Sequence, residues 1–250
     1  MRPRKCSITL LYWARMISFV VPAYNEEHEL PRTLAAIRHA AKDRPFEIIV
    51  VDDGSTDATV AVAELAGARI ISISRRHIAA ARNTGGRAAT GDVLFFVDAD
   101  TRIKQGHIDG AIAALQDGFS GGGARVEMEG LVPLWGQIFV RTFCALYFGL
   151  NFGAGAFLFT TRRNFTVVGG FDEQYFIGEE VYFSLALRRL GPFKVLREPV
   201  LTSGRKLRMY SAREILTRSF AIIIRGPRGA RARGRRLDLW YQGKRERPLG

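Results

Sequence analysis

Three short, largely apolar runs, each rich in β-branched or aromatic residues, end abruptly in clusters of polar and acidic side chains. They are residues 17–21, 47–51 and 93–97, and a pattern of helical period follows each cluster. Such runs are typical of strands buried on both faces of a parallel sheet. Strands that alternate with helices predict an α/β fold, with a Rossmann-like, mostly parallel central sheet and helices on both faces.

The intervening segments carry helix signals. Residues 30–42 place apolar side chains at helical spacing, and Pro31 suits a first helical turn. Residues 55–57 are suited to cap a second helix, and residues 78–89 predict a third. A further strand is expected at 69–73, so the first half of the chain repeats strand and helix throughout.

The acidic residues follow the strands at the edge where such sheets bind ligands. Asp98 and Asp100 follow residues 93–97, and Asp52 and Asp53 follow the preceding apolar strand. Burying unpaired carboxylates is costly, whereas carboxylate oxygens suit Mg²⁺ or Mn²⁺ and, through the metal, a diphosphate. One Asp-x-Asp alone would be interpreted as a turn with solvated aspartates. Three polar clusters at one edge predict a ligand site.

The positive charge of the chain is concentrated near its C-terminus. The formal net charge is +13, and residues from Leu201 onward hold fourteen Lys or Arg against three Asp or Glu, which leaves +2 for the preceding 200 residues. An Arg-rich segment at 225–236 has the composition of an anion-binding tail, suited to anionic lipid headgroups or nucleic acid. A solvated tail without a partner is the alternative.

One long uncharged segment requires a membrane test. Residues 142–161 hold no charged side chain, close to the roughly 20 residues that span a bilayer. Several glycines interrupt them, so we expect a buried helix around 134–148 and a strand at 156–160. An exposed apolar helix face is the second choice, and a true span the third. The two cysteines indicate reduced thiols of a cytosolic protein, and the four histidines are interpreted as surface or helix residues.

The polar clusters, taken together, resemble the motifs of family-2 glycosyltransferases of the GT-A fold. The similarity runs from about residue 17 to 190 and depends on the order and spacing of several short motifs. These are VPAYNE at 21–26, VDDGSTD at 51–57, ARNTG at 81–85, DAD at 98–100, GGFDE at 169–173 and GEEV at 178–181.

The resemblance implies a nucleotide-binding role for residues after the first two strands. Tyr24 would stack on the base, with Pro22, Ala23 and Glu26 shaping that pocket, and Asp53 would accept a hydrogen bond from the base. The donor would be a UDP-sugar, the commonest in the family. Without a ligand, Tyr24 would be an ordinary strand-end aromatic, and Asp53 a cap of a helix or turn.

The resemblance also implies a metal and a diphosphate site. Asp100 would be the first ligand of Mg²⁺ or Mn²⁺, and Asp98 would bind the ribose, or the metal through water. Arg82 would reach the diphosphate or the base, although an Arg on an amphipathic helix is more often solvated. Ser203, Arg205 or Lys206 either help to complete the metal and diphosphate site or form a simple basic turn.

The family's general base is the acid of a Glu-Asp pair that leads a helix. Here the pair is Glu179-Glu180, at the start of a helical run at 181–190, so Glu stands where Asp is usual. We expect Glu180 to be the base, with Glu179 as the alternative. The non-catalytic alternative for either residue is an acid that is favoured by the dipole at a helix N-terminus. The resemblance implies an inverting transfer to an acceptor hydroxyl.

The expected organisation has four parts. They are an N-terminal extension at 1–15, a nucleotide-sugar-binding half at 16–123, an acceptor-binding half of the same domain at 124–215, and a basic C-terminal tail at 216–250. Gly121-Gly122-Gly123 is interpreted as a hinge between the two halves.

Two other classes of function have sequence requirements that can be compared with this chain. A sugar-phosphate nucleotidyltransferase would need a Gly-rich, basic loop after the first strand, where this chain has an acidic loop without glycine. A non-enzymatic adaptor acting through the Arg-rich tail would bind anionic membrane or nucleic acid, but the sequence has no recognised nucleic-acid-binding module, so nucleic acid is not expected as a partner. By analogy, a glycan or lipid-linked acceptor and a cytoplasmic location, peripheral on the inner face of the plasma membrane, suit such a protein.

Overall fold

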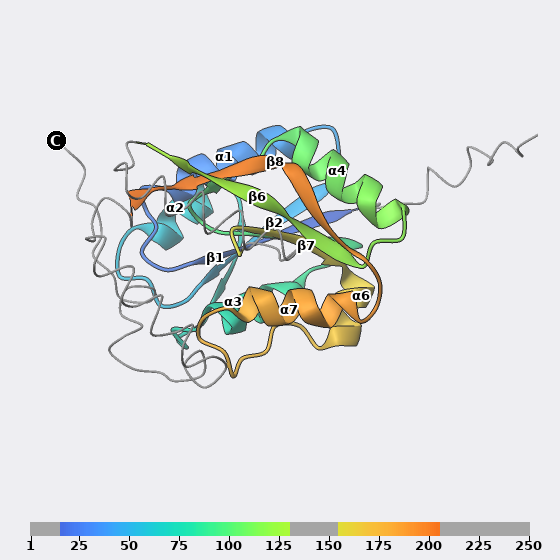
Figure 1. Cartoon of the computed structure of the whole chain (residues 1–250). Coiled ribbons are helices and arrows are strands. Elements are labelled where there is room, and N and C mark those ends of the chain that lie inside the picture. Colours follow the sequence, from blue (N-terminus) through green and yellow to red (C-terminus); the bar gives the residue numbers. More distant parts are fainter. Residues whose placement is uncertain (1–15, 131–154, 206–250) are drawn as a thin grey trace, which may run out of the picture.

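The computed structural model describes residues 16–130 and 155–205, and within them one mixed sheet forms the centre of the protein (Figure 1). Its eight strands follow the order β3-β2-β1-β4-β7-β6-β8-β5. The strands are β1 Ile17–Ala23, β2 Phe46–Asp52, β3 Arg69–Ser72, β4 Val93–Val97, β5 Thr101–Arg102, β6 Gly121–Glu129, β7 Phe157–Thr161 and β8 Phe193–Ser203. The helices are α1 Leu30–Ala41, α2 Thr59–Leu65, α3 Ile78–Ala88, α4 Gln105–Gln116, α6 Arg162–Val168 and α7 Glu179–Arg188.

The first half of the chain forms the parallel part of the sheet. Strands β3, β2, β1 and β4 pair in parallel, with Val20 opposite Ile49 on β2 and Phe96 on β4. All residues of β1 and β4 are buried, as their apolar sequences predict. The expected alternation of strands and helices is confirmed, and α/β is the fold class.

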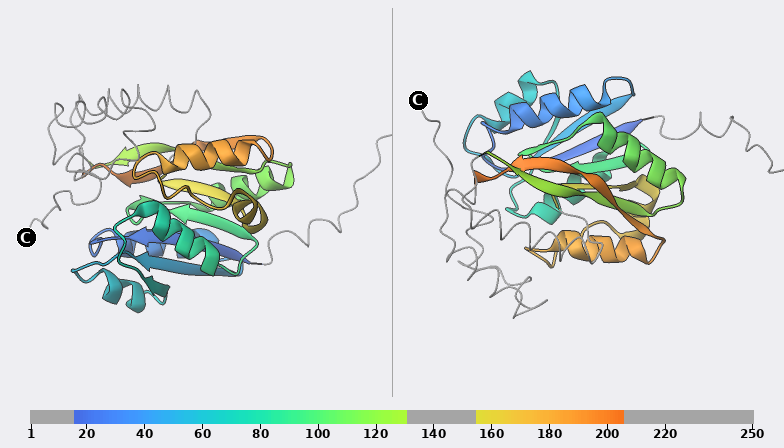
Figure 2. Two further views of the ribbon diagram at one scale, coloured as in Figure 1. Left: turned by 90° about the horizontal axis from the view of Figure 1, so that it is seen from below. Right: turned by 45° about the horizontal axis from the view of Figure 1, so that its top comes forward.

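Helices cover both faces of this sheet, and the side chains of each strand alternate between them. Phe19 and Phe95 pack in one core with α1, α2 and α4, whereas Val20 and Phe96 pack in a second core with α3, α6 and α7. Figure 1 shows the two groups of helices on opposite sides of the sheet, and the further views of Figure 2 show the same layers.

The second half of the chain adds the mixed part. Strand β7 runs antiparallel to both β4 and β6, and β8 pairs in parallel with β6. The expected strand at 156–160 and the helix at 181–190 are confirmed by β7 and α7. The segments at 1–15, 134–148 and 216–250 lie outside the described residues.

The hinge interpretation of Gly121-Gly122-Gly123 is wrong. These glycines begin strand β6 and are buried. A Cβ on Gly122 would lie 2.2 Å from the backbone oxygen of Lys194 and 2.3 Å from the ring of Phe159, so a side chain has no room. The glycines allow neighbouring strands and an aromatic ring to approach closely, and both halves of the chain share one sheet.

Among the described residues, no helix combines the length and the apolar character needed to cross a bilayer.

One partly buried glutamate, Glu47 on β2, bonds residues near the N-terminal ends of β1 and β4 and provides a stability test. Glu47 Oε1 accepts hydrogen bonds from Ser18 Oγ at 2.6 Å, Thr90 N at 2.6 Å and Thr90 Oγ1 at 2.7 Å. Burial alone would raise the pKa of Glu47, but these bonds and Arg69 outweigh it and lower the pKa below 4.5. The charged form is therefore the one that stabilises the fold.

We expect Glu47→Gln to lower the free energy of unfolding at pH 7 by about 1–3 kcal/mol, because a charged acceptor of several hydrogen bonds is lost. Since the folded pKa is depressed, this contribution is present above the unfolded pKa and is lost as the pH falls through the folded pKa. Urea unfolding at pH 7 and at decreasing pH below 4.5 should show the difference from wild type shrinking. Glu64→Gln, at an exposed position of α2, is the matched control, and a pH-independent difference for Glu47→Gln would contradict the assignment.

Candidate active site

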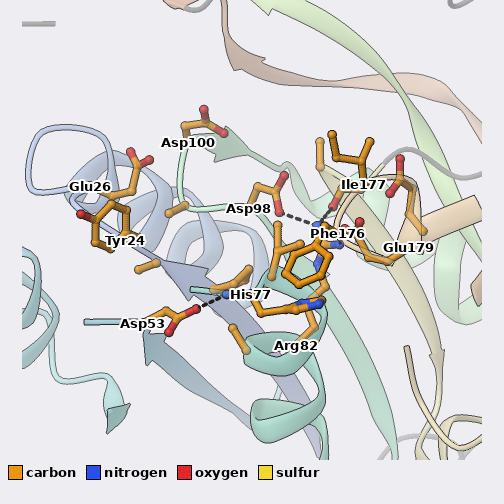
Figure 3. Close-up of a pocket in the computed structure, with 18 of the residues that line it drawn as sticks. Tyr24, Glu26, Asp53, His77, Arg82, Asp98, Asp100, Phe176, Ile177 and Glu179 are labelled. Carbon is orange, nitrogen blue, oxygen red and sulfur yellow. Dashed lines mark hydrogen bonds and ion pairs between the residues drawn. The ribbon is translucent and has the colours of Figure 1, made fainter. Parts of the chain in front are cut away.

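A pocket of about 320 Å³ opens at the carboxyl ends of the parallel strands and is lined by the ten residues to which the sequence assigned nucleotide, metal or base roles (Figure 3). These residues come from the loops after β1, β2 and β4, from helix α3 and from the start of α7. They are Pro22, Ala23, Tyr24, Glu26, Asp53, Arg82, Asp98, Asp100, Glu179 and Glu180. Residues far apart in the sequence therefore meet in one place, as expected for the ligand edge of an α/β sheet.

Hydrogen bonds between the loops after β1 and β2 fix the floor of this pocket. Asn25, which has a positive φ of 51°, donates its backbone N–H to Ser55 Oγ at 2.9 Å. Glu26 donates its N–H to Thr59 Oγ1 at 2.7 Å, and Thr56 N donates to Asn25 Oδ1 at 2.8 Å. Backbone groups of one loop thus bond side chains of the other, which holds Tyr24 and Glu26 in place.

Asp53 organises the loop that precedes α3. Its Oδ1 accepts the backbone N–H groups of Arg75 at 2.7 Å and Arg76 at 2.8 Å, and its Oδ2 accepts that of His77 at 2.6 Å. Asp53 therefore has a structural role in this loop. A carboxylate offers about four acceptor positions, so one remains after these three bonds.

The ring of Tyr24 is a stacking surface in the pocket. The guanidinium of Arg76 lies 3.1 Å from the ring centroid, a cation–π contact. Arg76 has a positive φ of 51°, and the three amide bonds to Asp53 hold this unusual backbone. The contact shows that the ring accepts a flat, delocalised group on its face.

Asp100 is held by the end of β8. Its Oδ1 accepts a hydrogen bond from Thr202 Oγ1 at 3.2 Å, and its Oδ2 lies 3.5 Å from Nη2 of Arg205. Arg205 is buried and also forms a two-pronged ion pair with Glu26. Arg205 therefore belongs to the pocket, and the simple basic turn that the sequence left open is excluded for this side chain.

Arg82 contacts Asp98 and Glu179, on another side of the pocket from Asp100 (Figure 3). Its Nη2 donates to Asp98 Oδ1 at 2.8 Å, and its Nη1 donates to Glu179 Oε1 at 2.5 Å. Burial alone would lower the pKa of Arg82, but Asp98, Glu179 and Glu180 outweigh it and raise the pKa. Figure 3 shows Asp98 reaching toward Arg82, with Asp100 and Glu26 farther along the same rim.

The two acids of the Glu179-Glu180 pair have different surroundings. Glu179 is buried and bonded to Arg82, whereas Glu180 is half-buried and forms no ion pair among the described residues. Burial raises the pKa of Glu179, and the neighbouring Glu180 raises it further. Burial also raises the pKa of Glu180. Such a pair can hold and exchange a proton near neutral pH.

Several further residues of the pocket were not predicted from the sequence, among them Arg76, His77 and Phe176. His77 is buried as the N-cap residue of α3, so its interpretation as a surface or helix residue is wrong. Its Nε2 lies 2.9 Å from the backbone oxygen of Glu173, and its ring packs 4.4 Å from that of Phe176. A single histidine in a loop gives no periodic signal, so only the fold reveals this position.

The charges of the pocket suit a divalent cation. Six carboxylates face three guanidinium groups among the residues that line it. The side chains of Asp98 and Asp100 remain 29% and 17% exposed, so both can accept further ligands. An anionic diphosphate would be repelled by this acidic excess unless a cation compensated it. In the described parts of the chain, no group of three or more His, Cys, Asp or Glu side chains is arranged to hold a metal by itself.

Comparison with known proteins decides the family. Residues 18–163 match the family described as Glycosyl transferase family 2, which is more than half of the chain. The chain belongs to this family.

Two curated relatives illustrate the match. An uncharacterised glycosyltransferase of Mycobacterium tuberculosis is 34% identical over 102 residues, which are 41% of this chain and 44% of the relative. The undecaprenyl-phosphate 4-deoxy-4-formamido-L-arabinose transferase of Pseudomonas fluorescens is 34% identical over 118 residues, which are 43% of this chain and 34% of the relative. The match spans less than half the length of these two relatives.

Two solved glycosyltransferase structures share the fold. The mannosyltransferase of Pyrobaculum calidifontis in complex with GDP-Man and Mn²⁺ has a TM-score of 0.62 at 19% identity, and the match covers 93% of this chain and 70% of that one. Glucosyl-3-phosphoglycerate synthase of Mycobacterium tuberculosis with Mn²⁺ and UDP has a TM-score of 0.59 at 17% identity, over 94% of this chain and 88% of that one. This family-2 protein therefore has a GT-A-like fold.

Proposed function

We propose that this family-2 glycosyltransferase moves a hexose from a UDP-sugar to an acceptor hydroxyl, with inversion at the anomeric carbon. The observation that supports the proposal is the single pocket that unites the Tyr24 ring, the Asp98 and Asp100 carboxylates and the Glu179-Glu180 pair. Family membership favours this function over a nucleotidyltransferase or a non-enzymatic adaptor.

The donor nucleotide would lie between the loops after β1 and β2. Its base would stack on Tyr24, either opposite the Arg76 guanidinium or in its place, beside Pro22 and Ala23. Asp53 would use its remaining acceptor position toward the base. Glu26 shapes this end of the pocket through its ion pair with Arg205.

Asp100 and Asp98 would hold Mg²⁺ or Mn²⁺ together with the diphosphate. The acidic excess of the pocket and the exposed carboxylate oxygens support this assignment. Such a cation, when bound, acts as a Lewis acid that stabilises negative charge on the diphosphate. Thr202 and Arg205 orient Asp100, and the backbone N–H of Ser203 donates to the backbone oxygen of Asp100 at 3.2 Å.

Glu180 would remove the proton of the attacking hydroxyl. A hydroxyl is a weak nucleophile at neutral pH, so a carboxylate at the N-terminus of α7 contributes by general-base catalysis. Glu180 suits this role better than Glu179, because the Glu179 carboxylate is already bonded to Arg82. Attack from the face opposite the diphosphate inverts the anomeric centre.

The acceptor would be a glycan or a lipid-linked molecule. The name of the Pseudomonas fluorescens relative gives undecaprenyl phosphate as part of what that enzyme acts on. A protein that takes such an acceptor must work at a membrane surface. The charge of the C-terminal sequence supports a cytoplasmic protein that binds the inner face of the membrane peripherally.

A panel of nucleotide sugars tests the proposed function. Purified protein is incubated with UDP-, GDP- and TDP-linked sugars, with Mn²⁺, Mg²⁺ or EDTA, and is scored by thermal shift and by slow release of nucleoside diphosphate. We expect stabilisation and release with at least one UDP-sugar, both abolished by EDTA. No response to any nucleotide sugar would contradict the proposal.

Tyr24→Ala should weaken the binding of UDP in the presence of Mn²⁺ by roughly 5- to 150-fold. Stacking of a base on an aromatic ring contributes about 1–3 kcal/mol, and about 1.4 kcal/mol corresponds to a tenfold change in affinity. Isothermal titration calorimetry measures the change. Tyr24→Phe, which keeps the ring, is the matched control. Equal affinities of wild type and Tyr24→Ala would show that the base binds elsewhere.

Truncation after Ile224 should abolish binding to vesicles that contain anionic lipid, because it removes the Arg-rich segment. Each Lys or Arg near such a surface contributes about 1 kcal/mol, an attraction that falls as salt screens it. Vesicle co-sedimentation at increasing NaCl measures both effects, with neutral vesicles as the control. Binding that persists unchanged in high salt would point to apolar contacts instead.

A further inference from the structure

The guanidinium of Arg82 donates three of its five N–H groups to protein acceptors. Its two terminal nitrogens bond Glu179 at 2.5 Å, Asp98 at 2.8 Å and the backbone oxygen of Gly155 at 2.9 Å. The side chain is only 1% exposed. Its Nε is shielded from solvent and has no acceptor among the described residues, so that donor does not face the pocket either. Both terminal nitrogens are therefore engaged by protein groups.

The local backbone is shaped around this arginine. Gly155 precedes β7, and a Cβ at this position would lie 3.0 Å from Nη2 of Arg82. Because Gly155 has no side chain, its carbonyl can approach the guanidinium and complete the set of three acceptors. The neighbouring Asn83 binds both the backbone N–H and the backbone oxygen of Phe171, at 2.8 Å each. Two consecutive residues of α3 therefore hold the segment that leads to α7.

Arg82 bonds one carboxylate on the donor side of the pocket and one beside the proposed general base. Asp98 follows β4 on the donor side, and Glu179 begins α7 beside the proposed base. A single cation between them fixes both carboxylates relative to each other. Glu180, one residue farther along, lines the same pocket without an ion pair to Arg82.

We propose that Arg82 is a positioning residue that bridges Asp98 and Glu179, which fixes Glu179 and leaves Glu180 to face the acceptor hydroxyl. This inference rests on the proposed function and differs from the donor contact expected for Arg82 from the sequence. Arg82 acts through Glu179, so its loss affects turnover more than nucleotide affinity. Its positive charge also lies between two carboxylates that would otherwise repel each other.

Four variants test the bridge. Arg82→Met removes the cation, Arg82→Met/Glu179→Gln removes it together with one partner, and Gly155→Ala crowds it without changing a charge. Arg87→Met, at an exposed position of the same helix α3, is the matched control. The readouts are the affinity for UDP with Mn²⁺ by calorimetry, and kcat with the UDP-sugar that turns over fastest in the panel.

We expect Arg82→Met to lower kcat about 100-fold, the lower end of the range of general-base contributions, while UDP affinity stays within about threefold. The double variant should be no slower than Arg82→Met, since both changes remove the same interaction. Gly155→Ala should lower kcat in the same direction, and Arg87→Met should resemble wild type. If Arg82→Met does not fold, the double variant and Gly155→Ala decide the matter by the same two readouts.

A loss of UDP affinity greater than tenfold with unchanged kcat would make Arg82 a donor contact and overturn the inference. Additive losses in the double variant would show that Arg82 does not act through Glu179. Wild-type values for Arg82→Met would reject the inference while the proposed function stands. Absence of binding and turnover in the wild-type protein would instead reject the proposed function, and this inference with it.

Discussion

Asp100→Ala is expected to lower kcat/KM at least about 10³-fold, because a metal that stabilises charge on the diphosphate contributes several kcal/mol. The variant should also lose Mn²⁺-dependent binding of UDP. It should remain folded, since Asp100 is a partly exposed carboxylate at the pocket rim, held by Thr202 and Arg205. Turnover by the wild type and the variant in a Mn²⁺ titration measures the effect.

Asp92→Asn is the matched control for this change. Asp92 flanks the other end of the same strand β4, and its exposed side chain lies 4.0 Å from Arg162. It should leave turnover and UDP binding unchanged. An Asp100→Ala variant with wild-type turnover, or one whose losses are explained by unfolding in circular dichroism, would contradict the metal assignment.

Glu180→Gln is expected to lower kcat by about 10²–10⁴-fold with donor affinity retained, as for the loss of a general base. Glutamine keeps the size of the side chain but cannot accept a proton. Because burial raises the pKa of Glu180, the wild-type pH–rate profile should fall on its acid side at a pH above the usual glutamate value of 4.5. A base must be deprotonated, so kcat should rise with pH through this raised pKa.

Glu179→Gln separates the two acids. It should disturb Arg82 and lower kcat less than Glu180→Gln does, since the Glu179 carboxylate is committed to the ion pair. Steady-state kinetics of both variants, together with UDP binding by calorimetry, distinguish the roles. If Glu179→Gln alone abolishes turnover, the base is Glu179 and the assignment shifts by one residue.

The parallel half of the fold could be predicted from sequence because its signals are local. Strands β1, β2 and β4 are continuous apolar runs, and α1 carries a clear helical period, so each element is recognisable by itself. The ligand edge followed from the same reasoning. Parallel strands end on one side, so their polar clusters had to meet there.

The mixed half gave weaker signals. Strand β8 contains Pro199 and several charged residues, and β5 has only two residues, so neither shows the pattern of a buried strand. The run Gly121-Gly122-Gly123 suggests flexibility when considered alone. Glycine is needed here because β6 packs closely against Phe159 and β8, and no local sequence pattern reveals this packing.

The members of the site could be predicted, but not the contacts between them. Arg205 pairs with Glu26 across 179 positions of the sequence, and it stood within a basic stretch that resembles a solvated tail. Arg82 lies on a helix where an arginine is usually exposed, yet it is buried between two carboxylates. Tertiary structure alone determines such charge pairs.

A crystal structure with UDP and Mn²⁺ tests the central claim most directly. We predict an anomalous manganese peak bound by an oxygen of Asp100 and by the diphosphate, with the uracil ring stacked on Tyr24 in the same pocket. A nucleotide bound away from Tyr24, or manganese that does not contact Asp98 or Asp100 directly or through water, would contradict the account.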